Sequence, residues 1–147
     1  MWMFLIAGIL VLVIGVLLAH MYKLAKQDFL HEVTLDFEDF PSSDRISLFF
    51  ISDVHRRNIS ESLVASAEGK VDFVLIGGDI TEKGVPLERV RGNLQKLKRM
   101  GPVYFIWGNN DYEADVRELD ALFMELGVKV LADEGVLFET KDGGIIN

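Results

Sequence analysis

The sequence contains no cysteine, which excludes a disulfide framework, a thiolate zinc site and a cysteine nucleophile. Positive charge is also scarce: 15 Lys and Arg face 23 Asp and Glu, and the net charge is −8. Nucleic-acid backbones are bound by clustered Lys and Arg, so this balance argues against a general nucleic-acid surface. Histidine is limited to His20, His31 and His55. A histidine-based metal site would therefore have few residues to draw on.

A long uncharged run opens the chain. Residues 1–19 carry no charged side chain, and 4–19 are almost entirely apolar, close to the roughly 20 residues that a helix needs to cross a bilayer. The alternative is a cleaved signal peptide, but no Lys or Arg precedes the run and Leu17-Leu18-Ala19 is a poor small-x-small cleavage site. We expect an uncleaved transmembrane anchor at residues 1–20. Lys23 and Lys26 place the remainder on the cytoplasmic side of the cell membrane.

The rest of the chain divides into two parts. Residues 21–45 read as a juxtamembrane segment with a half-buried edge strand at 33–37, where apolar and polar residues alternate. From residue 46 to 147, short β-rich runs alternate with amphipathic helical patterns, which is typical of a parallel α/β sheet whose strands are buried. The periodicity predicts strands at 48–51, 71–76, 128–131 and from 103 onward, helices at 60–67, 86–100 and 115–126, and a glycine-turn hairpin at 135–146.

Three of these apolar runs end in side chains that can ligate a metal. Asp53 and His55 follow the first run, Asp79 follows the second and Asn109 follows the third. In open α/β sheets the ligand site lies at the carboxyl ends of the strands, where these residues would meet. On an extended backbone, side chains two residues apart point the same way, so Asp53 and His55 can approach one ion together. Oxygen and nitrogen ligands without sulfur favour Mn²⁺, Fe²⁺ or Zn²⁺.

Asp79 has two carboxylate oxygens and could bridge two ions. Two metals about 3.5–4 Å apart are the usual device for in-line phosphoryl transfer, in which activated water is the nucleophile and no covalent enzyme intermediate forms. Gly77, Gly78 and Gly108 allow tight turns, so a substrate oxygen could approach without meeting a Cβ. Arg56 and Arg57 could clamp a phosphate, although a solvated loop is the simpler interpretation.

The order and spacing of these residues resemble a known family. Asp53-Val54-His55, Gly78-Asp79 and Gly108-Asn109-Asn110-Asp111 are similar to the N-terminal signature of the calcineurin-like metallophosphoesterases, over roughly residues 46–147. The resemblance implies an α/β sandwich and a dinuclear centre that hydrolyses phosphomonoesters or phosphodiesters. It implies that Asp53 and His55 ligate the first metal, that Asp79 bridges and that Asn109 ligates the second.

Two features depart from the family pattern. Asn110 stands where the family usually has a histidine near the leaving group, and an amide cannot deliver a proton at neutral pH, so leaving groups of low pKa are favoured. Asp111 would ordinarily orient that histidine, and here it is expected to be a corner or helix-capping residue. These two are the candidate catalytic positions.

The second departure is that no histidine follows His55, whereas the family completes its site with later histidines. The chain is therefore predicted to be the truncated N-terminal half of such an enzyme, preceded by one transmembrane helix. Two alternatives remain open at this point. One is a catalytically dead, membrane-anchored binding or regulatory remnant, and the other is an unrelated doubly wound domain whose Asp and His residues cap strands.

Overall fold

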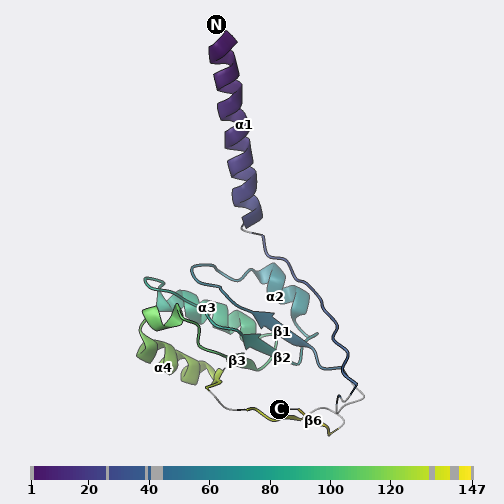
Figure 1. Ribbon diagram of the computed structural model, residues 1–147. Coiled ribbons are helices and arrows are strands. Elements are labelled where there is room, and N and C mark those ends of the chain that lie inside the picture. The colour runs from purple at the N-terminus through teal and green to yellow at the C-terminus, as the bar shows by residue number, and fades with distance from the viewer. Residues whose placement is uncertain are drawn as a thin grey trace. The chain divides into compact units, whose positions relative to one another are not determined.

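The computed structural model describes residues 2–25, 27–38, 40, 45–132, 135–139 and 143–146. The chain forms two compact units, Met1–His31 and Glu32–Asn147. The first unit consists mainly of a single helix, α1 (Trp2–Ala25), drawn in purple in Figure 1. Its span Trp2–Leu24 is long and apolar enough to cross a membrane, with a mean hydropathy of 2.9, a criterion that a signal sequence also meets.

The second unit is built on a four-stranded parallel sheet in the order β1-β2-β3-β4 (Figure 1). Each strand is joined to its neighbour by a helix, which is the βαβ connection that parallel strands require. The strands are β1 (Leu48–Ile51), β2 (Phe73–Ile76), β3 (Val103–Phe105) and β4 (Lys129–Val130). The connecting helices are α2 (Glu61–Ala67), α3 (Leu87–Lys98) and α4 (Val116–Leu126), with a short 3₁₀ helix, η1 (Asp111–Glu113), before α4.

Local signals fix the ends of these helices. Ser60 caps α2 by accepting a hydrogen bond from the Leu63 N–H (3.2 Å), and Asp115 caps α4 by accepting from two backbone N–H groups of its first turn. Gly127 ends α4 with φ = 64°, a left-handed conformation that glycine adopts without steric cost. The strands and helices predicted between residues 46 and 131 are confirmed as elements, with differences of a few residues at their boundaries.

One face of the sheet and the three connecting helices form a single core. Phe49, Val74, Ile76, Val103 and Phe105 of the strands pack against buried helix residues, namely Val64, Ala67, Val90, Leu94, Leu97, Leu119, Leu122 and Phe123. The strands were expected to be buried, and this holds for the face that packs on the helices, whereas Leu48 and Phe50 of β1 remain exposed. Right-handed connections between strands in sequential order place all the helices on the same face of a sheet, which leaves the other face without helices. On that face the ring of Phe73 lies 5.1 Å from the ring of Phe138.

Two further expectations concern the flanks of the sheet. The prediction of an edge strand at residues 33–37 is wrong. These residues form no strand, and Val33, Leu35 and Phe37 are exposed. Alternation describes a face but supplies no partner strand, and an unpaired strand has no ladder to hold it. The hairpin is confirmed by the antiparallel pairing of β5 (Phe138–Glu139) with β6 (Ile145–Ile146). Residues 140–142 of its predicted turn lie outside the described residues.

Candidate metal centre

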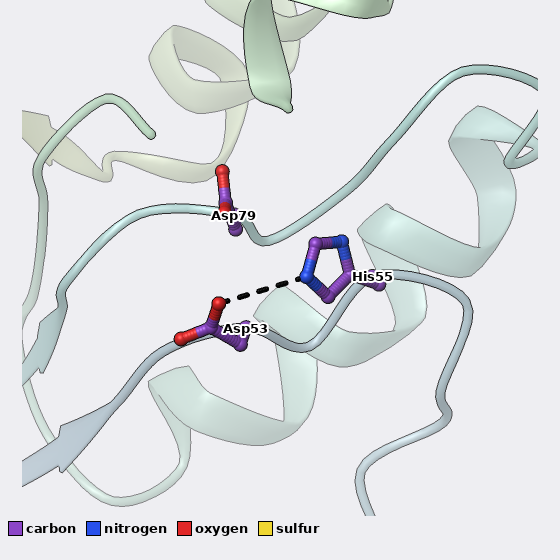
Figure 2. Close-up of side chains that lie close together, drawn as sticks. All are labelled: Asp53, His55 and Asp79. Atoms are coloured by element: carbon purple, nitrogen blue, oxygen red, sulfur yellow. Dashed lines mark ion pairs between the residues drawn. The ribbon is translucent and has the colours of Figure 1, made fainter. Parts of the chain in front are cut away.

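The loops that follow β1 and β2 bring three ligand-type side chains together at the carboxyl end of the sheet. Asp53 and His55 lie on the first loop and Asp79 lies on the second, and their side chains gather in the space between the loops (Figure 2). Two backbone hydrogen bonds join the loops: the Asp53 N–H donates to the Gly78 carbonyl (3.3 Å) and the His55 N–H donates to the Asp79 carbonyl (3.1 Å). The backbone therefore fixes the separation of the three side chains.

All three residues have a left-handed backbone. Their φ angles are 54° for Asp53, 50° for His55 and 55° for Asp79, and they are the only non-glycine residues of the described chain with positive φ. This conformation costs a non-glycine residue roughly 1–2 kcal/mol. The prediction of an extended backbone at Asp53 and His55 is therefore wrong. The two side chains come together because both residues adopt the left-handed conformation. Strain that persists at three neighbouring positions is typical of functional sites.

The cluster can hold one divalent ion. One ligand atom each from Asp53, His55 and Asp79 lies within 4.8 Å of the others, and Nε2 of His55 is 3.6 Å from Oδ1 of Asp53. Metal bonds of 2.0–2.2 Å place ligand atoms on opposite sides of an ion about 4.2 Å apart. Rotation of the Asp53 side chain, which is 69% exposed, can supply the small adjustment required.

Asp79 is held in place by Asn110 on the loop after β3. The backbone N–H of Asn110 donates to Oδ1 of Asp79 (2.9 Å) and its side-chain amide donates to Oδ2 (2.8 Å). Burial acts to raise the pKa of Asp79, but these hydrogen bonds and the nearby His55 outweigh it and leave the pKa below its ordinary value. A buried carboxylate that stays ionised is suited to binding a cation.

Asp111 is fully buried and organises the corner in which Asp79 lies. Its carboxylate accepts hydrogen bonds from the backbone N–H groups of Asp79 (2.8 Å), Thr81 (3.0 Å) and Gly108 (2.9 Å). Burial raises the pKa of Asp111 above its ordinary value, against the opposing effect of these three bonds, and the charge of Asp79 adds to the rise. These contacts fit the expected role of a corner residue. Asn109 is exposed in the turn just before Asn110, and its role as a ligand stays a prediction.

Gly108 makes room for Asp79. A Cβ at this position would lie 2.2 Å from Oδ1 and 2.4 Å from the backbone nitrogen of Asp79, so no larger residue fits without displacing the carboxylate. Gly78 has φ = 91°, and its Cβ would lie 2.8 Å from Cα of Gly108. From the sequence, the space beside these glycines was expected to admit a substrate oxygen. In the structure, the carboxylate of Asp79 fills the space beside Gly108, and the backbone of Gly108 fills the space beside Gly78.

Sequence reasoning missed Glu82. Its Oε2 lies 3.1 Å from Nδ1 of His55, and its other oxygen accepts a hydrogen bond from the guanidinium of Arg56. No periodic pattern marks Glu82, because it lies on a loop, three residues after Asp79. The phosphate clamp considered for Arg56 is replaced in this structure by an ion pair within the protein.

Taken together, the fold and site define a parallel α/β domain in which three side chains of metal-ligand type meet at the carboxyl ends of β1 and β2. The chain belongs to the calcineurin-like phosphoesterase family, whose model matches residues 46–143. It is 38% identical over 135 residues to the uncharacterized protein YpbG of Bacillus subtilis (strain 168), covering 90% of this chain and 52% of YpbG. It is also 28% identical over 124 residues to the uncharacterized metallophosphoesterase YkoQ of the same strain, covering 77% of this chain and 46% of YkoQ. The chain thus spans about half the length of these relatives.

Proposed function

We propose that this chain supplies the N-terminal metal site of a membrane-anchored phosphoesterase that hydrolyses phosphomonoesters or phosphodiesters. The observation that carries the proposal is the convergence of Asp53, His55 and Asp79, all in strained backbone conformations, in a chain of the calcineurin-like phosphoesterase family. Of the two alternatives to an enzyme, the unrelated α/β domain is excluded by the family match.

Each residue of the centre has a proposed task. Asp53 and His55 would hold the first divalent ion, and Asp79 would be a ligand shared between the first and a second ion. Asn109 is the proposed protein ligand of the second ion, with Mn, Fe or Zn as the candidate metals. Bound divalent ions would polarise phosphoryl oxygens and make water acidic enough to act as a nucleophile.

Asn110 sets a limit on the leaving group. Its amide already donates to Oδ2 of Asp79, and it has no proton that it can transfer at neutral pH. We therefore propose that the substrates are esters whose leaving group departs without protonation, such as aryl esters. Asp111 contributes by fixing the backbone of Asp79 and Gly108 through its hydrogen bonds.

The location of the enzyme is also a proposal. It rests on α1, which is long and apolar enough to span a bilayer, on Lys23 in the last turn of that helix, and on Lys26, which follows it in sequence. By the positive-inside rule, these lysines favour a cytoplasmic catalytic domain.

A second candidate is a regulatory domain that binds metal without hydrolysing esters, favoured by Asn110 in place of histidine. The test is hydrolysis of bis(p-nitrophenyl) phosphate by the full chain in detergent with Mn²⁺. An enzyme predicts activity that falls to the protein-free background in Asp79→Asn and persists in Glu125→Gln, a control on the surface of α4. Mn²⁺ binding without hydrolysis in the wild type would support the regulatory candidate, whereas neither binding nor hydrolysis would refute both.

A further inference from the structure

The two ring nitrogens of His55 have different surroundings. Nε2 lies on the side of the candidate metal ligand Asp53, 3.6 Å from its Oδ1. Nδ1 is shielded from solvent and forms no hydrogen bond of good geometry, although Oε2 of Glu82 is only 3.1 Å away. A buried ring nitrogen beside a carboxylate is an arrangement that requires an explanation.

Metal binding by histidine requires one specific tautomer. The ligating nitrogen must offer its lone pair, so the other nitrogen carries the proton and usually donates it to a carboxylate or carbonyl. At His55, Nε2 is the nitrogen on the side of Asp53. Nδ1 must then carry the proton, and Oε2 of Glu82 lies within reach as its acceptor.

Glu82 is itself held by the loop after β1. The guanidinium of Arg56 donates through Nε to Oε1 of Glu82 and through a second nitrogen to the carbonyl of Lys83 (3.3 Å). Arg89 of α3 donates to the carbonyl of Arg56 (2.9 Å), which ties this loop to the helix. Arg56 thus engages one oxygen of Glu82 and leaves the other directed at Nδ1 of His55.

We propose that Glu82 is a positioning residue that selects the Nδ1–H tautomer of His55 and thereby presents Nε2 to the metal. The inference rests on the proposed function only where it concerns metal affinity. Both partners of the Glu82 carboxylate are donors, so a carboxylate can serve both at once. A glutamine at this position has one acceptor oxygen and could serve only one of them.

The first measurement is Mn²⁺ affinity by isothermal titration, using the full chain in detergent. Glu82→Gln is expected to bind Mn²⁺ about 10- to 100-fold more weakly than the wild type, the usual effect of removing a group that orients a ligand. Glu125→Gln is the matched control, because Glu125 also pairs with an arginine, Arg91, but on the surface of α4. Equal affinities in the wild type and Glu82→Gln would overturn the proposal.

The second measurement reads the tautomer without any metal. Long-range ¹⁵N–¹H NMR, recorded at rising pH until the ring signals no longer change, distinguishes protonated Nδ1 from protonated Nε2 in the neutral ring, and His55→Gln identifies the signal. The wild type is expected to show Nδ1–H, and Glu82→Gln is expected to show a mixture or the Nε2–H form, with unchanged circular dichroism. A wild-type Nε2–H tautomer would refute the role of Glu82 even if Mn²⁺ binds. Because this readout needs no metal, it separates failure of the inference from failure of the proposed function.

Discussion

Replacement of Gly108 by alanine tests whether the loop after β3 shapes the metal site. The new Cβ would lie 2.2 Å from Oδ1 of Asp79, and ordinary contact begins at 3.4 Å, so the two groups must separate by about 1.2 Å. The side chain of Asp79 cannot relieve the clash alone, because its backbone nitrogen would also lie 2.4 Å from the Cβ. Overpacking of this kind costs about 1–3 kcal/mol of stability. Misplacement of a reacting group by about 1 Å can lower a rate by about 10²-fold.

The matched control is the same substitution at Gly92 in α3, where a Cβ meets nothing within 4 Å. Alanine in a helix interior is more favourable than glycine by about 0.5–1 kcal/mol, so Gly92→Ala should stabilise the protein. Urea unfolding followed by circular dichroism measures the change in stability. Mn²⁺ titration of each variant measures binding at the displaced Asp79, and hydrolysis of bis(p-nitrophenyl) phosphate measures the change in rate. A Gly108→Ala protein as stable as the wild type and equal to it in Mn²⁺ affinity would refute the argument.

Three other predictions address the corner, a surface ion pair and the leaving group. Asp111→Asn leaves at least one buried backbone N–H without an acceptor, so urea unfolding should show a loss of about 1–3 kcal/mol; an unchanged midpoint would contradict this. Glu61→Gln removes the partner of Arg99 (2.7 Å), whose hydrogen bond lowers the pKa of Glu61 from 4.5. Because the pKa of Glu61 is lower in the folded than in the unfolded protein, its ionised form stabilises the fold at pH values above the unfolded pKa. This stabilisation is lost as the pH falls through the folded pKa. The melting temperatures of the wild type and the variant should therefore differ at pH 7 and converge in acid. Asn110→His should extend hydrolysis to alkyl phosphate esters, measured by phosphate or alcohol release, and activity confined to aryl esters would argue against the assignment.

Much of the fold could be predicted because its signals are local. Ser60 and Asp115 cap helices where the capping pattern indicates, and Gly127 ends α4 in the left-handed conformation that glycine favours. The strand expected at 33–37 fails because pairing depends on a neighbour that alternation does not reveal. The face without helices, on which Phe50 is exposed, likewise depends on which side the connecting helices take, a property of the whole topology.

The site could be predicted in part. The residues of the Asp53, His55 and Asp79 cluster were identified from their position after apolar runs, because parallel strands deliver such residues to one edge. The left-handed turns that bring them together are not predictable from the residue types alone. Aspartate and histidine adopt positive φ more often than most other non-glycine residues, but it is still an uncommon conformation for them. Glu82 was missed because its contact with His55 joins loops 27 residues apart in sequence and follows no period.

The central claim is that Asp53, His55 and Asp79 form one metal centre, and Mn²⁺ titration of the full chain in detergent tests it most directly. Electron paramagnetic resonance reports free Mn²⁺, so binding appears as a loss of signal. The account predicts saturable binding by the wild type and by Glu125→Gln, with loss of that binding in Asp53→Asn, His55→Gln and Asp79→Asn. A wild type that binds no Mn²⁺, or three variants that bind it as the wild type does, would contradict the account.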